Sequence, residues 1–381
     1  MNHKERISAF VTEIWKWYAS HKRILPWRDL IIADATERAY RILVSEIMLQ
    51  QTQVPRVSVT YRNFLEKFPT INDLADASNK EVLMAWRGMG YNSRALRLKD
   101  AAKMIVEGRG RGGVGVRGRE LINDLNPNPN PNPSPNPGFP TSMEDLRSIP
   151  GIGHYTAAAI RNFAFGIPTP CIDTNIRRIL HRTFVGPENP DGTWEKDDEY
   201  LLGIADEVLK EAVSQGNRGN RSNRGNRGSS VTSDSSVASV SSEWHAALMD
   251  FGSLIQTKRN PKWEICPLTR EGIMKTTEKS FGLRVSSYEH LATRNPQPAT
   301  SSAKREPGRT VGSTFIPNRI FRGRVIESLR DAPRGLTLSD IGKQIAIDWD
   351  PKEHQEWLRG ILKKLTQETM LGIKKGKYVL G

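Results

Sequence analysis

The string Pro150-Gly151-Ile152-Gly153 separates two helical patterns, and it constrains the fold of this chain more than any other feature. Proline and glycine end the helix predicted over 142–149, and a second helix is predicted over 154–165. Glycines let backbone N–H groups approach an anion, and a helix N-terminus adds partial positive charge. The turn therefore predicts a phosphate site without a cationic side chain, although a plain helix–helix turn has the same residues.

Amphipathic helical patterns recur along the chain, whereas strand alternation is nearly absent from its body. Residues 3–20 begin the series, with Ile7, Phe10 and Ile14 at helical spacing. The body is therefore predicted to be all-α. Further helices are predicted at 38–49, 56–67, 79–86, 93–107, 142–149, 154–165, 174–183, 195–213 and 243–256.

Two low-complexity inserts and a polar linker divide the chain. Residues 108–140 join a Gly/Arg run to Asn-Pro repeats, and proline excludes helix and sheet there. Residues 215–242 combine Gly-Asn-Arg repeats with serines, which is typical of a disordered loop. With a linker at 284–312, these segments leave a helical domain over 1–283 and a C-terminal domain over 313–381.

The C-terminal domain has a pattern of its own, three helices followed by two short strands. We expect helices at 318–330, 337–345 and 351–367, and strands at 370–374 and 378–380. This order is typical of a winged helix, in which Arg359, Lys363 and Lys364 would face DNA. A small protein-interaction or packing domain has the same pattern, so both interpretations stay open.

Charge and cysteine content narrow the class of protein. A net charge of +14 over 381 residues favours a polyanionic partner. Two cysteines, Cys171 and Cys266, imply no disulfide framework and exclude a four-cysteine metal site. We find no signal peptide and no apolar run of membrane-spanning length. We expect an intracellular protein that binds no membrane, cytoplasmic and, in a prokaryote, associated with the nucleoid.

Two carboxylates lie where acid–base or electrostatic chemistry is plausible. Glu46 is surrounded in sequence by apolar residues, which raise the pKa of a carboxyl and keep it able to donate a proton. Asp173 precedes a helix that carries Arg177, Arg178 and Arg182. A carboxylate near basic residues and a phosphate site suggests chemistry on nucleic acid. An exposed glutamate and a helix N-cap are the simpler interpretations.

Five strings, in order, resemble the MutY-type adenine glycosylases of the endonuclease III superfamily. They are Leu25–Arg28, Ser45–Val54, Trp86–Ala95, the hairpin at 146–182 and Ala247–Gly252. The resemblance covers about residues 5–283 apart from the inserts. It implies an all-α helix-hairpin-helix DNA glycosylase fold, here followed by a small winged-helix-like (α+β) domain.

The resemblance implies a monofunctional enzyme that hydrolyses the N-glycosidic bond of adenine mispaired with guanine or 8-oxoguanine. Glu46 would protonate the adenine and Asp173 would stabilise the sugar cation. Tyr155 and Asn175 would position that aspartate. Relatives that also cleave the strand carry a lysine at position 155, whose amine forms a Schiff base. The phenol of Tyr155 cannot form that imine.

The resemblance also implies a DNA interface and a base pocket. Gln51 would enter the duplex and Tyr91 would wedge into the stack, while Asn92 stands where the family has a second tyrosine. The DNA-binding residues would be Gln50, Gln51, Tyr91, Pro150, Gly151, Gly153 and His154. The base pocket would contain Trp27, Arg28, Thr52, Val54 and Asp250, since a stacking Trp and a hydrogen-bonding Arg suit a flipped purine. A buried Trp, a helix-flanking Arg and a tyrosine that anchors the core are the simpler interpretations.

Two departures from the family pattern matter. The four cysteines that hold its iron–sulfur cluster correspond here to Gln256, Trp263, Cys266 and Gly272, and one thiolate cannot hold such a cluster. We therefore predict no required cofactor and no metal ligands, apart from the monovalent cation that the family binds at the hairpin. The C-terminal domain is not Nudix-like, so the preference for the base opposite adenine stays open.

Two other functions stay open. A glycosylase for thymine or damaged pyrimidines would fit the fold, but Gln50-Gln51 and the missing lysine at 155 argue against it. A non-catalytic DNA-binding protein would need neither Glu46 nor Asp173. The predicted partner is double-stranded DNA with a mispaired adenine, bound by a monomer.

Overall fold

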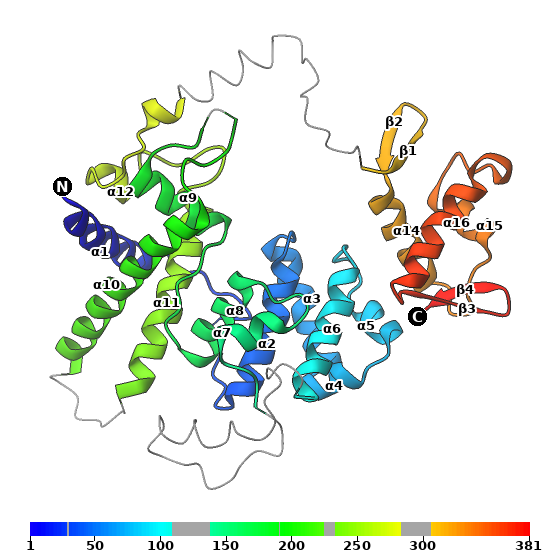
Figure 1. Ribbon diagram of the computed structural model, residues 1–381, viewed down its shortest axis with the longest axis horizontal. Coiled ribbons are helices and arrows are strands. Elements are labelled where there is room, and N and C mark those ends of the chain that lie inside the picture. Colours follow the sequence, from blue (N-terminus) through cyan, green and yellow to red (C-terminus); the bar gives the residue numbers. More distant parts are fainter. Residues whose placement is uncertain (29, 109–137, 190, 225–232, 283–305) are drawn as a thin grey trace, which may run out of the picture. The chain divides into compact units, whose positions relative to one another are not determined.

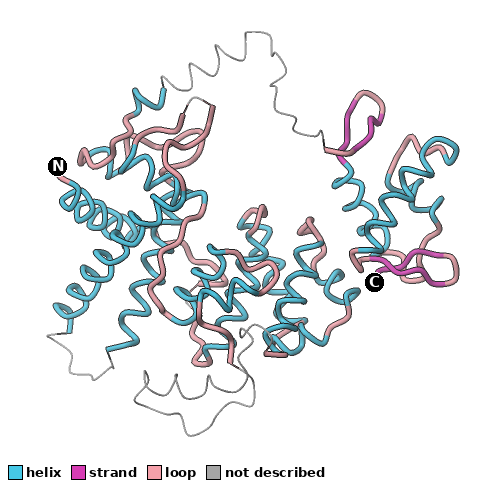
Figure 2. The backbone as a smooth tube through the Cα atoms, in the orientation of Figure 1, coloured by secondary structure: helices cyan, strands magenta, loops and turns pink. Residues whose placement is uncertain are grey.

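Helices form most of the described chain (Figures 1 and 2). The computed structural model describes residues 1–28, 30–108, 138–189, 191–224, 233–282 and 306–381. Backbone contacts divide the chain into two units. Unit 1 comprises residues 1–42 and 153–300, and unit 2 comprises residues 43–152 and 301–381. Among the described residues, no helix has the length and apolar character needed to cross a membrane.

Unit 1 is built from helices around an aromatic core. Its elements are α1 (His3–His21), α8 (His154–Ile160), the π-helical turn Arg161–Phe165, α9 (Thr174–Leu180), a second π-helical turn His181–Val185, α10 (Asp198–Arg224), α11 (Ser233–Leu254) and α12 (Pro267–Arg270). The side chain of Asn2 and that of Glu5 cap the first turn of α1 reciprocally. The apolar face of α1 then buries Phe10, whose ring meets those of Phe184 and Trp244 edge-on.

Helix α2 (Ala35–Leu49) continues from unit 1 into unit 2. Before its C-terminal part, unit 2 also contains α3 (Val54–Lys67), α4 (Ile71–Asp76), α5 (Asn79–Ala85), α6 (Ser93–Val106) and α7 (Met143–Ser148). Capping boxes at Thr70 and Ser78 start α4 and α5, so these short helices begin at residues that the sequence specifies locally. The sequence pattern had not predicted α4.

The C-terminal part of unit 2 has the predicted three helices and strand pair. They are α14 (Asn318–Arg330), α15 (Leu338–Ile345), α16 (Pro351–Gln367), β3 (Leu371–Lys374) and β4 (Lys377–Leu380). A second antiparallel pair, β1 (Gly308–Val311) with β2 (Thr314–Pro317), was not predicted, because four-residue strands give almost no alternation. The fold class, all-α with a small α+β C-terminal domain, is confirmed.

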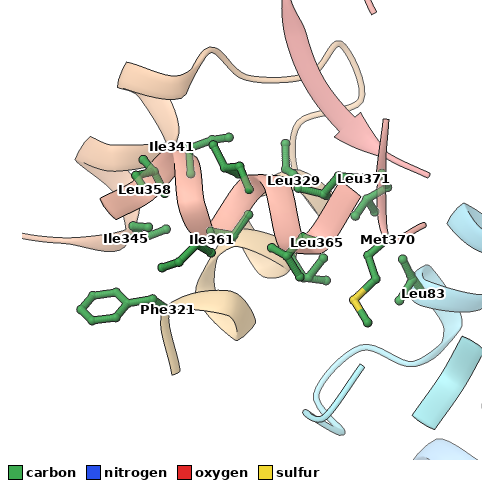
Figure 3. Packing of buried hydrophobic residues seen from close by; sticks show 14 of the residues in the cluster. Leu83, Phe321, Leu329, Ile341, Ile345, Leu358, Ile361, Leu365, Met370 and Leu371 are labelled. Atoms are coloured by element: carbon green, nitrogen blue, oxygen red, sulfur yellow. The ribbon is translucent and has the colours of Figure 1, made fainter. Parts of the chain in front are cut away.

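An apolar cluster forms the core of the C-terminal part (Figure 3). Phe321 of α14, Ile341 of α15 and Leu365 of α16 are each fully buried in it. Leu83 of α5 and Leu96 of α6 belong to the same cluster. The C-terminal helices therefore share their core with α5 and α6 within unit 2.

One of the two predicted inserts can be compared with the structure, whereas most of the other insert and most of the linker cannot. Helix α10 continues to Arg224 and α11 begins at Ser233, so both helices enter the segment 215–242 that the sequence predicted to be a loop. Packing explains the difference, because a Cβ on Gly216 would lie 2.7 Å from Val240 and the two helices contact each other there. Residues 109–137 and 283–305, which hold most of the other insert and the linker, lie outside the described residues.

Arg182 is a fully buried cation inside unit 1. It donates to both carboxylate oxygens of Glu188, at 2.7 and 3.2 Å, and to the side-chain oxygen of Gln256 at 3.1 Å. Its guanidinium lies 4.8 Å from the ring centre of Phe281 and 5.9 Å from that of Trp263. A buried charge is tolerated only when it is paired and hydrogen-bonded, and this network meets that condition.

We predict that Arg182→Met lowers the free energy of unfolding by about 3–5 kcal/mol, because it leaves the carboxylate of Glu188 buried without its partner. The double variant with Glu188→Met should lose less. Arg177→Met, which removes the exposed pair with Asp198, is the matched control and should cost about 1 kcal/mol or less. Urea unfolding measures all three, and equal losses for Arg182→Met and Arg177→Met would contradict the prediction.

Candidate functional site

Asp173 caps the N-terminus of α9 and is held rigidly by it. One carboxylate oxygen accepts the backbone N–H groups of Asn175 and Ile176 at 2.9 and 2.6 Å. The other oxygen accepts the side-chain amide of Asn175 at 2.9 Å. An aspartate N-cap is a local consequence of sequence, since its side chain satisfies N–H groups that have no partner inside the helix. Asp173 and Asn175 are therefore brought together as predicted.

Opposing effects act on the pKa of the Asp173 carboxyl group. Desolvation raises its pKa above the ordinary value and outweighs the hydrogen bonds from Ile176 and Asn175 and the charge of Arg178, which lower it. The residue as a whole is half-buried. A desolvated but firmly held carboxylate can interact strongly with a positive charge that develops beside it.

Arg178 supports this arrangement from behind. It donates to the side-chain oxygen of Asn175 at 2.7 Å and to the backbone oxygen of Gly252 at 2.7 Å. A Cβ on Gly252 would lie 2.7 Å from the Cβ of Asn175, so the glycine allows α11 to approach α9. The sequence suggested that the arginines after Asp173 were basic residues near nucleic acid. Arg178 and Arg182 are instead buried structural residues, whereas Arg177 pairs with Asp198 on the surface.

The predicted hairpin turn joins α7, which ends at Ser148, to α8, which begins at His154. Gly151 has a φ of +90°, a conformation that favours glycine, and Gly153 precedes the first turn of α8. Gly153 and His154 are exposed. Tyr155 directs its hydroxyl at the sulfur of Met249 on α11, 3.9 Å away.

Two of the residues predicted to form the base pocket, Arg28 and Asp250, belong to one cluster of ion pairs in unit 1. Asp250 is fully buried and accepts from Arg28 at 2.7 Å and from Arg23 at 2.6 Å through the side chain and 3.0 Å through the backbone. The structure thus brings Arg28 and Asp250 together, as the prediction of a common pocket requires. Sequence reasoning missed Arg23. Trp27 is buried, which agrees with the simpler interpretation of that residue.

Glu46 lies on the buried face of α2 in unit 2. Its side chain is 8% exposed, and Leu43, Ile47 and Met48 on the same helix are buried with it. The exposed-glutamate interpretation is therefore wrong for this residue. Helix α2 ends at Leu49, and the chain then turns outward through Gln50, which is half-buried.

Gln51 occupies the turn between α2 and α3 in a left-handed conformation with a φ of +57°, and its side chain is exposed. Few residues other than glycine adopt this conformation without cost. Thr52 and Val54, which were assigned to the base pocket, follow it and are half-buried. Gln51 therefore projects from the turn, as a residue that enters a duplex must.

Arg94 connects this turn to the loop that carries Tyr91. Its guanidinium donates to the backbone oxygens of Ile47 and Met48, each at 3.0 Å, and to that of Gln50. It also donates to the hydroxyl of Thr52 at 2.9 Å. Burial lowers the pKa of Arg94 to about 10, so the side chain stays charged at neutral pH. Sequence reasoning assigned it no role.

Tyr91 follows Gly88 and Gly90, which both have positive φ, and has a φ of +45° itself. The residue is 49% exposed, and the centre of its ring lies 5.5 Å from the guanidinium carbon of Arg94. The core anchor of this loop is Trp86, which is fully buried and donates from its ring nitrogen to the backbone oxygen of Gly90 at 3.1 Å. Tyr91 is therefore not a core anchor.

Gln51 and Tyr91 line a groove of about 1390 Å³ within unit 2. Its other wall comes from α14 and α16 and includes Arg319 and Lys364. Within the described part of the chain, Lys364 and Arg56, which also lines the groove, have no ion-pair partner. Lys364, Arg359 and Lys363 are exposed on α16, as the sequence interpretation requires.

The residues at the family's cluster positions do not fit an iron–sulfur cluster. Gln256 donates to the sulfur of Cys266 at 3.4 Å, and Trp263 is buried with its ring 5.5 Å from that of Phe281. Gly272 offers no side chain. Such a cluster needs four thiolates, and among the described residues no group of three or more His, Cys, Asp or Glu side chains is placed to hold a metal.

Comparison with known proteins finds a family that part of this chain resembles. Residues 44–198 match the family described as "HhH-GPD superfamily base excision DNA repair protein". The adenine DNA glycosylase of Homo sapiens is 36% identical over 209 residues, which are 54% of this chain and 33% of that protein. The chain thus matches about a third of the length of the human, mouse and rat relatives.

Two further similarities cover more of the chain. The adenine DNA glycosylase of Mycolicibacterium smegmatis is 28% identical over 358 residues, which are 93% of this chain and 92% of that protein. The structure of a thermostable thymine-DNA glycosylase covers 75% of this chain and 98% of its own, with 20% identity and a TM-score of 0.49. Over residues 44–198 the chain is therefore similar to the HhH-GPD superfamily of base excision DNA repair proteins, and the relatives named above are adenine DNA glycosylases.

Proposed function

We propose that the protein is a monofunctional DNA glycosylase that hydrolyses the N-glycosidic bond of adenine mispaired with guanine or 8-oxoguanine in double-stranded DNA. The observation that carries the proposal is the carboxylate of Asp173, which is desolvated and fixed by three hydrogen bonds. The adenine DNA glycosylases similar to this chain support the choice of base. The protein acts as a monomer.

The proposed reaction loses the base through a sugar that develops oxocarbenium character. The ionised carboxylate of Asp173 stabilises that positive charge, either by charge alone or by a transient bond to the sugar carbon. Asn175 keeps the carboxylate oriented, and Arg178 keeps Asn175 in place. Water then adds to the sugar carbon and leaves an abasic site.

Glu46 supplies the proton that makes adenine a leaving group. It is buried on α2, next to apolar side chains of the same helix, which suits a general acid that meets a base withdrawn from water. The base must leave the stack to reach it. Gln51 and Tyr91, both exposed on turns that Arg94 joins, fill and wedge the gap. Arg28, oriented by Asp250, contributes to the pocket for the flipped base.

Two features of the sequence support hydrolysis without a cofactor. The residue after His154 is Tyr155, whose phenol cannot form an imine with the sugar. The donor set at Gln256, Trp263, Cys266 and Gly272 does not suit an iron–sulfur cluster. We therefore propose that base loss proceeds without strand cleavage and that no cluster is required. A monovalent cation at the hairpin stays a prediction from the family resemblance.

Single-turnover assays on duplexes with A·G, A·8-oxoguanine, T·G and A·T pairs test the proposal. We expect adenine release from the first two duplexes only, and strand breaks only after alkali. Release of thymine would favour a different mismatch glycosylase. Binding without release of any base would favour a non-catalytic DNA-binding protein. Strand cleavage without alkali, trapped by borohydride, would contradict the monofunctional assignment.

We predict that Asp173→Asn lowers the single-turnover rate constant by about 100-fold or more, because the amide keeps the size of the side chain but loses the charge. Glu46→Gln should lose activity similarly, since an amide cannot donate the proton. Binding of the mispaired duplex should change little in both. Asp198→Asn, an exposed aspartate after Asp173 in the chain, is the matched control. Excision by Asp173→Asn within tenfold of the wild type would remove this residue from its role.

We also predict an acid limb in the pH profile of excision above the ordinary pKa of aspartate. The carboxylate of Asp173 must be ionised, and its pKa is raised, so the rate constant falls as pH drops through that raised value. Asn175→Ala removes a hydrogen bond that lowers this pKa and should move the limb to higher pH. Asn189→Ala, which alters an exposed loop, should leave it in place. A uniform loss in Asn175→Ala with an unmoved limb would contradict the assignment.

A further inference from the structure

Arg330 ends α14 with its side chain buried, although it lies in the C-terminal domain of a basic protein. Its side chain donates twice to the backbone oxygen of Leu83, at 3.0 and 2.7 Å. It also donates to the side-chain oxygen of Asn92 at 3.0 Å and pairs with Glu327 of its own helix. Only 5% of the residue is exposed. Such an arginine is committed to protein contacts and is not available to DNA.

Apolar packing and surface pairs surround this contact. Leu83 lies beside Met370 in the core of the C-terminal domain (Figure 3). The side chain of Asn79 donates to the backbone oxygen of Thr369 at 3.0 Å. Around it, Arg87 pairs with Asp331 and Glu327 on the surface. The domain is therefore packed against α5 and the start of α6 within unit 2.

The acceptor Asn92 directly follows Tyr91 in the chain. Its side chain does not cap α6, and the bond to Arg330 accounts for it instead. Its backbone oxygen accepts the N–H of Ala95 at 3.1 Å, and that of Tyr91 accepts the N–H of Arg94 at 2.9 Å. Arg330 of the C-terminal domain is thus connected to Arg94 through its hydrogen bond to Asn92 and through Tyr91, the residue before Asn92. Arg94 in turn contacts the turn that carries Gln51.

The conformation of Tyr91 needs such support. A φ of +45° is costly for a residue with a side chain and persists only where neighbours enforce it. About half of the surface of Tyr91 is exposed, so core packing contributes little to holding this residue in place. Gly88 and Gly90 carry no side chains, and on this side the loop is anchored by Trp86 and the buried Met89. The bond to Arg330 restrains the loop on its other side.

We propose that Arg330 is a positioning residue for the wedge, which holds the Tyr91 loop in the conformation that enters DNA. The C-terminal domain is then part of the device that unstacks the target base, in addition to any phosphate contacts made by Arg359, Lys363 and Lys364. The inference rests on the proposed function for its biological meaning. It accounts for an asparagine at position 92, because the oxygen there accepts the bond from Arg330.

The test compares Arg330→Met, Asn92→Leu and the double variant with Arg334→Met, an exposed arginine of the same domain as the matched control. Two quantities are measured at saturating protein. One is the single-turnover rate constant on the A·8-oxoguanine duplex. The other is the fluorescence of 2-aminopurine placed beside a 2′-fluorinated adenosine that resists excision, which reports unstacking directly. Thermal unfolding of each variant is measured alongside.

We expect Arg330→Met to lower the rate constant at least tenfold and to reduce the fluorescence gain, while Arg334→Met changes neither. The double variant should be no slower than the slower single variant, because both substitutions break one contact. Rate and fluorescence equal to those of Arg334→Met, with only a lower Tm, would overturn the inference. So would independent, multiplicative losses in the double variant.

Two further arms keep the outcomes separate. Should Arg330→Met fail to fold, Arg330→Lys retains the charge near Glu327 but cannot reach both acceptors, and a loss in the same direction is expected. An unchanged rate and fluorescence in Arg330→Lys would then overturn the inference. If the wild-type protein excises no base, the proposed function fails, and the fluorescence arm alone decides whether Arg330 positions the wedge.

Discussion

The turn after α2 and the loop before α6 both depend on the guanidinium of Arg94. The last carbonyls of a helix have no partner within it, and at the end of α2 Arg94 binds several of them at once. The same group binds Thr52 and lies 5.6 Å from the ring centre of Trp86. A planar group with five donors can do this, whereas a lysine ammonium cannot match the fork geometry. Without it, the turn after α2 and the loop before α6 would have no common support.

Buried arginines recur in both units and change the meaning of the net charge. Arg94, Arg178, Arg182 and Arg330 all lie below the surface and all donate to backbone oxygens. Each satisfies carbonyls at a helix end or loop where the backbone ladder stops. Part of the +14 charge therefore holds the fold together and offers nothing to phosphates. Composition alone overstates the electrostatic attraction for DNA.

Local features of the fold could be predicted from sequence, and long-range ones could not. The apolar face of α1, the burial of Glu46 and the N-cap at Asp173 follow from residues within one helix turn. The continuation of α10 and α11 into a glycine-rich segment depends on packing between the two helices, which overrides propensity. The docking of Arg330 on Leu83 joins residues 247 positions apart, and no local pattern announces it.

The candidate site divides along the same line. Sequence placed Asn175 beside Asp173 and assigned both Arg28 and Asp250 to one base pocket. It missed Arg23, which completes the charge balance around Asp250 from outside every motif. Catalytic roles for these residues stay predictions until activity is measured.

The positive φ angles of Gln51 and Tyr91 limit which residues can ever stand at these positions. Branching at Cβ crowds the left-handed region, so valine and isoleucine are disfavoured at these two positions whatever their fit to DNA. Asparagine and glycine tolerate the backbone but lack the reach to fill a vacated stack. The backbone conformation thus restricts the residue types at these two positions, independently of what their side chains contact. Adaptation to a new lesion would have to begin by reshaping the turns and only then change the side chains.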